Sequence, residues 1–298
     1  MKSKDTFSSY HPVINFLYFI LVLVFGMCFM HPVCLGITLI SALWYSINLN
    51  GGKGVKFALT YMLPLFIIAT IFNPMFNHEG ATILSYLPSG NPLTLESIIY
   101  GLASASMLTA VVLWFSCYSE VMTSDKFIYL FGKVIPALSL VISMTLRFIP
   151  KFKDQMNVVI DSQRSLGRDM NEKGLIKKIR RAITVISIMI TWSLENAVET
   201  AASMNSRGYG LPGRTAFSIY TFDKRDLKAL VWLLISAAVV CIGWVKGEFY
   251  SSYYPLLKFE ISNAFSFIYF VMYFALCLTP VFINTVEDVK WKHIKSEI

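Results

Sequence analysis

Charged side chains are scarce in this chain. Asp, Glu, Lys and Arg make up 15% of its 298 residues, whereas a typical soluble domain has roughly 25%. The surface of a soluble protein must face water, so this scarcity argues against an ordinary soluble domain. Hydrophobic residues make up 55% of the chain, and the mean hydropathy is +0.58. A protein that lies mostly in the lipid bilayer accounts for this composition more simply.

Metal-binding and redox patterns are lacking as well. The histidines lie far apart without the spacing of metal ligands, and the cysteines lie in apolar stretches without a C-x-x-C pair. We therefore expect no metal site and no cofactor, and cysteines that act as small buried hydrophobes. The residues concerned are His11, His31, His78, His293, Cys28, Cys34, Cys117, Cys241 and Cys277.

Signatures of catalysis are also missing from the sequence. The run Gly51-Gly-Lys53-Gly lacks the Ser or Thr and the earlier Gly of a phosphate-binding P-loop, and it predicts a tight turn instead. Glu195 and Glu199 lie one helical turn apart, and paired carboxylates can do acid–base chemistry. Such a pair more often marks a helix face held by salt bridges or by a partner. A membrane-integral enzyme is thus kept only as an alternative.

Apolar runs are what the sequence has in abundance. A spanning helix needs about 20 mostly apolar residues, and basic residues without a following signal-peptide cleavage site precede the first run. Two further stretches are ambiguous. Phe127–Phe148 is apolar but contains charges and a proline, and Ala182–Leu194 is apolar but short. The six expected spans are Val13–Met30, Val33–Ile47, Phe57–Phe72, Ile98–Cys117, Leu227–Val245 and Ala264–Ile283.

The distribution of the positive charge predicts the topology. The net charge is +8, and the loop 73–97 contains no Lys or Arg. With six spans and both termini in the cytoplasm, only Lys246 and Lys258 of the 26 basic residues lie outside, as the positive-inside rule demands. If both ambiguous stretches crossed the membrane, the basic residues between them would lie outside the cell, which the positive-inside rule disfavours. Because the charge follows the topology so closely, we expect no nucleic-acid partner.

The chain is therefore predicted to have three parts: four membrane helices in residues 1–118, a cytoplasmic segment in 119–226, and two membrane helices with a basic tail in 227–298. An apolar helical segment outside the bilayer must lie on the membrane surface or on a partner. Its expected helices are Ser124–Val134, one from a break at Pro136 to Phe148, one from a break at Pro150 over Lys151–Leu166, and Lys177–Ser206.

Two of these cytoplasmic helices end in similar motifs. In Ser206-Arg207-Gly208, glycine suits the left-handed position after a helix, and arginine suits the negative end of the helix dipole. This pattern is that of an ordinary helix stop, but Arg207 can equally bind a carboxylate or carbonyl groups on a partner. Gln163-Arg164-Ser-Leu166-Gly167-Arg168 closes the other helix. Two such tips suit a partner with two similar sites, for example a pair of ATPase subunits.

Six short motifs, in this order and at this spacing, resemble the T component of energy-coupling factor (ECF) transporters. The resemblance runs from about His11 to Phe222. The motifs are Asn73-Pro-Met-Phe76 with Gly80, Gly90-Asn-Pro-Leu-Thr-Leu-Glu96, Ser124-Asp-Lys-Phe127, Leu146-Arg-Phe-Ile-Pro150, Gln163-Arg164-Ser-Leu-Gly167 and Ser206-Arg207-Gly208-Tyr209-Gly210.

The resemblance implies an all-α polytopic scaffold with a layer of long cytoplasmic coupling helices, in the plasma membrane of a prokaryote. In this family the coupling helices dock into grooves of two ABC-type ATPases, which bind the ATP. A separate small membrane protein, the S component, binds a vitamin, a metal ion or another micronutrient. Closure of the ATPases shifts the coupling helices, and the S component then releases its substrate inside the cell. The T component itself is not an enzyme.

The resemblance also assigns the two tips as ATPase-docking sites. Ser206, Arg207 and Gly208 match the second docking motif, and Gln163, Arg164, Gly167 and Arg168 belong to the first. The first motif departs from the family pattern, because Leu166 stands where the family has arginine. The alternative function is a conventional ABC permease that forms the substrate path itself. Such a path predicts polar residues inside the spans, and these spans contain almost none.

Overall fold

The computed structural model describes residues 5–86, 91–132, 136–167, 174–211, 220–259 and 266–296. The chain divides into two compact units. Unit 1 is Met1–Phe127 with Tyr220–Ile298, and unit 2 is Ile128–Ile219. Unit 1 contains the apolar helices, and unit 2 contains two long amphipathic helices.

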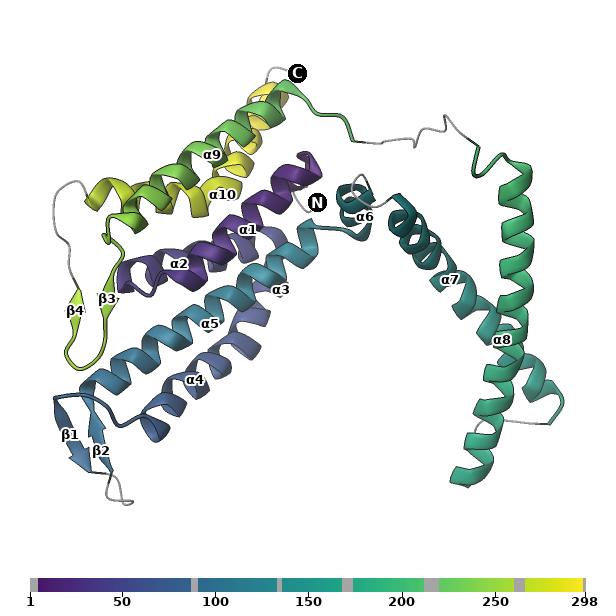
Figure 1. The fold of residues 1–298 in the computed structure, drawn as a ribbon, viewed down its shortest axis with the longest axis horizontal. Helices are drawn as coiled ribbons and strands as arrows, with labels where there is room; N and C mark the ends of the chain where they lie inside the picture. Colours follow the sequence, from purple (N-terminus) through teal and green to yellow (C-terminus); the bar gives the residue numbers. More distant parts are fainter. Residues whose placement is uncertain are drawn as a thin grey trace. The chain divides into compact units, whose positions relative to one another are not determined.

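Unit 1 is a bundle of apolar helices (Figure 1). A short 3₁₀ turn η1 precedes them, and two small antiparallel hairpins connect them. The helices are α1 (Pro12–Cys28), α2 (Pro32–Asn50), α3 (Gly52–Phe57), the π-helical turn η2 (Ala58–Met62), α4 (Leu63–Phe76), α5 (Leu95–Val121), α9 (Lys224–Val245) and α10 (Ser266–Ser296). The turn and strands are η1 (Phe7–Ser9), β1 (Ile83–Tyr86), β2 (Pro92–Thr94), β3 (Ser251–Ser252) and β4 (Lys258–Phe259). The short helix α6 (Ser124–Gly132) follows α5.

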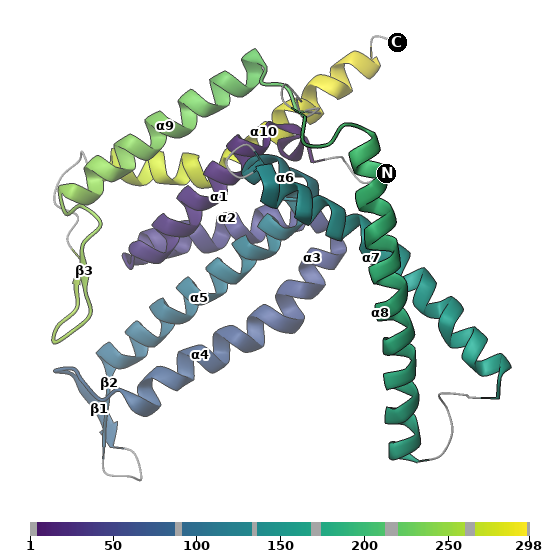
Figure 2. The same cartoon turned by 45° about the vertical axis from the view of Figure 1, so that its right-hand side comes forward.

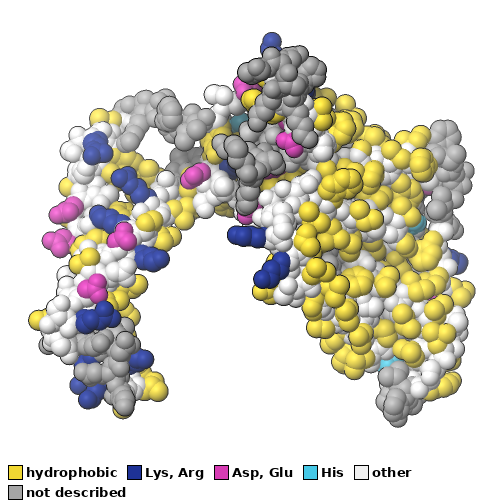
Figure 3. Space-filling model, turned by 180° about the vertical axis from the view of Figure 1, so that it is seen from behind, with side chains coloured by type: hydrophobic (Ala, Val, Ile, Leu, Met, Phe, Trp, Pro, Cys, Tyr) yellow, Lys and Arg dark blue, Asp and Glu magenta, His cyan; other side chains and the backbone are white. Residues whose placement is uncertain are grey.

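The prediction of an all-α polytopic membrane protein is confirmed. Five helical stretches of the described residues are long and apolar enough to span a bilayer: Pro32–Asn50, Gly52–Phe76, Leu95–Val121, Lys224–Val245 and Ser266–Trp291. The remaining predicted span, Val13–Met30, corresponds to α1, which is apolar but has only 17 residues. Hydrophobic side chains cover most of the unit 1 face that is seen in Figure 3. This surface suits contact with lipid.

Local sequence explains where several helices begin and bend. The side chain of His11 accepts a hydrogen bond from the Val13 amide, and that of His31 accepts one from the Val33 amide, so both histidines cap helices that start with proline. The π-helical turn η2 directly precedes Leu63-Pro64. Proline lacks the amide that a regular α-helix needs there, and a π turn is one way to accommodate the interruption.

Aromatic side chains fill the centre of unit 1. Tyr18, Phe19 and Trp114 are fully buried, and the rings of Tyr18 and Trp114 meet edge to face with centroids 5.9 Å apart. The Tyr18 hydroxyl donates to the Cys277 carbonyl at 2.9 Å, whereas the Trp114 indole nitrogen has no hydrogen-bond partner among the described residues. Packed aromatic pairs add about 0.5–1.5 kcal/mol each beyond the burial of their area. The bundle therefore has a solid core.

The Asn73-Pro74 motif lies where α4 crosses α5. A Cβ atom built on Gly101 would lie 2.7 Å from the Thr70 carbonyl oxygen and 3.2 Å from the Cβ of Asn73. Only glycine permits so close an approach of the two helices.

A buried polar cluster ties the N-terminal segment to the bundle. The Asp5 carboxylate accepts hydrogen bonds from the Tyr45 hydroxyl, at 3.1 Å, and from the Asn284 amide. Nearby, the Lys126 ammonium donates to the carbonyl of Ser8 at 2.5 Å and to that of Val121 at 2.9 Å. Lys126 is only 7% exposed, and burial lowers its pKa, with Asp5 acting in the opposite direction.

Unit 2 consists mainly of α7 (Pro136–Ser165) and α8 (Leu175–Ser206), which cross each other (Figure 2). At the crossing, the rings of Phe152 and Trp192 meet edge to face with centroids 5.3 Å apart. Lys151 lies over the Trp192 ring, 5.6 Å from its centroid, and its ammonium donates to the Asn196 side chain at 3.0 Å. These contacts fix one crossing point between two otherwise exposed helices.

The predicted break at Pro150 is wrong, because α7 runs through this residue. Proline removes one backbone hydrogen bond, that to the Leu146 carbonyl. The packing of Lys151 and Phe152 against α8 directly after the proline offsets this loss. The predicted break at Pro136 agrees with the structure, since α7 begins there.

Candidate functional site

The end of α8 has the hydrogen bonds of a complete Schellman motif. The Tyr209 amide donates to the Met204 carbonyl at 3.0 Å, and the Gly208 amide donates to the Asn205 carbonyl at 3.0 Å. Gly208 has φ +78°, a conformation that residues with a side chain avoid. The motif therefore turns the chain sharply directly after Arg207, which is the C-cap residue of α8.

Arg207 is exposed at this tip. Among the residues that the structure describes, its side chain forms no hydrogen bond or ion pair. Tyr209 and Leu211 beside it are 43% and 67% exposed. The tip thus presents a guanidinium with five N–H donors, flanked by two large apolar groups. Arginine and tyrosine are among the residues that most often dominate the binding energy of protein interfaces.

The end of α7 is a simpler helix stop. The Gly167 amide donates to the Arg164 carbonyl at 2.9 Å, and Gly167 has φ +73°. Arg164 forms an ion pair with Asp161, with Nη1 and Oδ1 3.4 Å apart; both side chains are more than half exposed, so the pair contributes little to stability. Gln163 is half-buried and Leu166 is 67% exposed. Arg168, the remaining predicted docking residue, lies outside the described residues.

The structure thus brings the predicted residues together in two tips, and it separates these tips. The α7 tip directly precedes the start of α8, and the α8 tip lies at its other end (Figure 1). With 32 residues, α8 is about 48 Å long. A partner that held both tips would need two sites far apart.

An exposed apolar stripe along α8 is a feature that the sequence analysis did not identify. Its members recur every three or four residues, so they share one face of the helix. Each of them is at least 52% exposed. The face toward α7 is different and contains Val185, which is 6% exposed. The stripe consists of Ile176, Ile179, Ile183, Ile186, Ile190, Leu194 and Val198. The three-and-four spacing of these residues was a signal for it.

No group of three or more His, Cys, Asp or Glu side chains within the described ranges is placed to hold a metal ion. The histidines that the sequence singled out have structural roles at His11 and His31, which cap α1 and α2.

Comparison with known proteins gives this arrangement a family. Residues 6–217 match the family model described as CbiQ, cobalt transport protein, and this range includes both helix tips. An energy-coupling factor transporter transmembrane protein EcfT from Lactobacillus helveticus is 33% identical over 114 residues, 38% of this chain and 41% of that protein. EcfT from Bacillus selenitireducens is 26% identical over 206 residues, 65% of this chain and 75% of that protein.

The match to the L. helveticus protein and that to EcfT from Lactococcus lactis each span about two fifths of the relative's length, 41% in both. The family model extends over more than two thirds of the chain and over both units. This multi-pass membrane protein belongs to the CbiQ family of cobalt transport proteins.

Proposed function

We propose that this chain is the transmembrane coupling component of an energy-coupling factor importer. It links ATP hydrolysis by two partner ATPases to uptake of a vitamin, metal ion or other micronutrient that a separate S component binds. The family match and the EcfT relatives support this proposal. The chain has no catalytic role of its own, and ATP binds to the ATPase subunits.

The exposed Arg207 tip is the observation that carries the proposal. A planar guanidinium can satisfy a carboxylate or two carbonyl groups in a groove of a partner. The Schellman motif fixes the turn after Arg207 through the amides of Gly208 and Tyr209, so little order has to be gained on docking. Ser206, Arg207 and Gly208 therefore form the stronger of the two docking sites.

The α7 tip is the second ATPase-docking site. Leu166 supplies an exposed apolar contact there, while Gln163, Arg164, Gly167 and Arg168 supply the polar ones. Because α8 alone is about 48 Å long, each tip engages a different ATPase subunit. Closure of the ATPases moves the two tips, and the contacts of Lys151 and Phe152 with α8 transmit this movement to the crossing point.

The apolar stripe along α8 is the surface that contacts the S component. Exposed apolar patches of this extent mark interaction sites. When the tips move, the stripe turns with the helix, and this displaces the S component so that it releases its substrate. The stripe has no ligand selectivity of its own, which fits a scaffold whose S component recognises the substrate.

The proposed topology places both termini and unit 2 in the cytoplasm of a prokaryotic cell. The basic residues of unit 2 and of the C-terminal tail then obey the positive-inside rule. A conventional permease that forms the substrate path itself is disfavoured, because Tyr18, Phe19 and Trp114 fill the centre of unit 1.

Co-purification tests the proposal. The tagged protein is isolated from its own host in mild detergent, and everything that comes with it is identified. We expect two ABC-type ATPases and a small membrane protein with the wild type, and a loss of the ATPases with Arg207→Ala. Removing one partner of a buried interfacial charge costs about 2–5 kcal/mol. Lys153→Ala is the matched control, because it removes an exposed cation of α7 that lies 14 residues before Gly167 and belongs to neither tip. If no ATPase accompanies the wild type, the proposal is wrong.

A further inference from the structure

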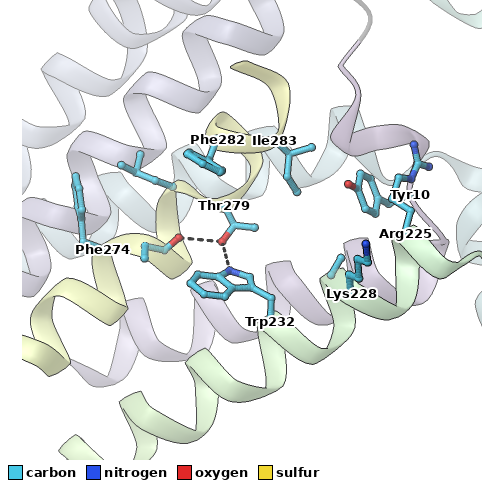
Figure 4. Close-up of a pocket in the computed structure, with 11 residues that line it drawn as sticks. Tyr10, Arg225, Lys228, Trp232, Phe274, Thr279, Phe282 and Ile283 are labelled. Atoms are coloured by element: carbon cyan, nitrogen blue, oxygen red, sulfur yellow. Dashed lines mark hydrogen bonds between the residues drawn. The ribbon is translucent and has the colours of Figure 1, made fainter. Parts of the chain in front are cut away.

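A groove between α9 and α10 lies within unit 1, and none of its lining residues belongs to either helix tip. It has a volume of about 580 Å³, within the range of about 300–1,000 Å³ of small-molecule sites. Its walls are mostly apolar and include Trp232, Phe274, Leu278 and Phe282. Figure 4 shows Phe274 at one end, Tyr10, Arg225 and Lys228 at the other, and Trp232 and Thr279 between them.

The apolar part of the groove has few polar atoms left to bind a ligand. The Trp232 indole donates to the Thr279 hydroxyl at 3.2 Å, and this hydroxyl donates to the Ala275 carbonyl at 2.9 Å (Figure 4). These groups satisfy each other within the wall. The occupant of this part of the groove is therefore a hydrocarbon rather than a polar solute.

The length of the groove matches one leaflet of a bilayer. On α10 its lining runs from Phe274 to Ile283, which is about 14 Å at 1.5 Å per residue. The hydrocarbon core of a bilayer is about 30 Å thick, so the groove covers about half of it. The groove is therefore long enough for one acyl chain of a lipid whose headgroup lies at one membrane face.

The cationic end of the groove can recognise a phosphate. Arg225 is held in place, because its guanidinium lies over the Tyr10 ring at 4.2 Å and its Nη2 donates to the Ser9 carbonyl at 3.3 Å. Nη2 also donates to the Ser9 hydroxyl at 3.4 Å, whereas Nε and Nη1 form no hydrogen bond with the described residues. Lys228 is one turn further along α9, on the same face, and its ammonium has no hydrogen bond or ion pair within the described ranges.

The carboxylates near this end are engaged elsewhere. Asp226 is buried and accepts hydrogen bonds from the amides of His11, at 3.3 Å, and Asp223, at 3.1 Å. Glu287 forms an ion pair with Lys290, with Oε1 and Nζ 3.8 Å apart. The two cations of the groove are therefore not neutralised by a carboxylate within hydrogen-bonding reach.

We propose that this groove binds an anionic phospholipid, with one acyl chain along Trp232 and Phe274 and the phosphate between Arg225 and Lys228. Basic residues at a membrane face attract anionic lipids, each by about fivefold in affinity. Long basic side chains reach the headgroup level while their stems stay in the apolar region. The site is independent of ATPase docking, because none of its residues belongs to either tip.

Native mass spectrometry of the delipidated protein, titrated with phosphatidylglycerol and with phosphatidylcholine, tests this inference. The variants are Lys228→Gln, which removes a cation without structural bonds, and Ala275→Phe, which fills the groove. Lys246→Gln, at the other end of α9, is the matched control with the same charge change. Thermal unfolding in a zwitterionic detergent verifies that each variant folds.

We expect the wild type to bind phosphatidylglycerol more tightly than phosphatidylcholine. Lys228→Gln should weaken the phosphatidylglycerol complex by about fivefold, Ala275→Phe should weaken both lipid complexes, and Lys246→Gln should leave both unchanged. Equal binding of the two lipids by the wild type would overturn the inference. So would equal effects of the Lys228 and Lys246 substitutions, or a dimer of this chain that Ala275→Phe dissociates, which would assign the groove to protein contact.

Discussion

The Tyr209 amide donates a 3.0 Å hydrogen bond to the Met204 carbonyl and closes the end of α8. This bond requires the left-handed conformation of Gly208, with φ +78°. The position of Arg207 therefore depends on a neighbour that has no side chain. A helix that ended by fraying would hold the same arginine loosely, and docking would then have to order it at an entropic cost.

The first prediction concerns Gly208→Ala. A side chain in the left-handed region costs about 1–2 kcal/mol, and the new Cβ would also lie 3.1 Å from the Leu211 side chain. We expect about tenfold less ATPase in co-purification and no change in the thermal stability of unit 1. Gly210→Ala is the control, because Gly210 also has a positive φ, +93°, but takes no part in the two bonds of the Schellman motif. Equal effects of the two substitutions would show that the motif itself is unimportant.

The second prediction concerns the crossing of α4 and α5. Gly101→Ala should destabilise the protein by about 1–3 kcal/mol, because a Cβ 2.7 Å from the Thr70 carbonyl forces two helices apart. The measurement is thermal unfolding in detergent. Gly36→Ala in α2, where a Cβ would meet nothing within 4 Å, is the control and should be neutral or slightly stabilising. A Gly101 variant as stable as this control would contradict the close approach.

The third prediction is a pH dependence that Lys126 causes. Burial lowers the pKa of Lys126 from its ordinary value of 10.5. Just below pH 10.5, the unfolded state therefore binds more protons than the folded state, and Lys126 makes the stability rise with pH. Unfolding temperatures of the wild type and of Lys126→Met are compared as the pH is raised toward this value. The wild type should gain stability relative to the variant; a relative loss or no difference would refute the role of burial.

The fourth prediction follows from the apolar stripe on α8 and rests on the proposed function. Ile183→Asn with Ile190→Asn should release the S component and retain the ATPases, because both isoleucines are more than half exposed and lie far from the tips. Loss of an apolar contact of this size costs roughly 1.5–3 kcal/mol per side chain. Co-purification measures both partners at once. Thr191→Asn, on another face of the same helix, should change neither.

Much of the fold could be predicted from local patterns. Apolar runs and their flanking lysines locate α2, α5 and α9 to within a few residues, because the bilayer imposes a length and the topology imposes a charge pattern. The start of α10 is located equally well, but this helix continues to Ser296, beyond the predicted end at Ile283. The glycines of both tips also signal their helix ends, since left-handed backbone at Gly167 and Gly208 is a local requirement. The break at Pro150 was wrong because tertiary packing of Phe152 and Trp192 overrides a local preference.

The features that sequence could not locate join distant parts of the chain. Lys126 and Ser8 are 118 positions apart, and nothing local shows that this lysine is buried. The groove likewise combines Tyr10 before α1 with Lys228 on α9 and Phe282 on α10. Only the packing of the bundle brings these residues together.

The most direct test of the central claim is site-specific photo-crosslinking in the intact host membrane. A photoreactive amino acid replaces one residue at a time: Tyr209 at the α8 tip, Leu166 at the α7 tip, or Ile183 in the apolar stripe of α8. The account predicts crosslinks from both tips to ABC-type ATPases, and crosslinks from position 183 to a small membrane protein instead. Crosslinks from positions 209 and 166 only to lipid, or to proteins other than ATPases, would contradict the claim that these helix tips couple ATP hydrolysis to transport.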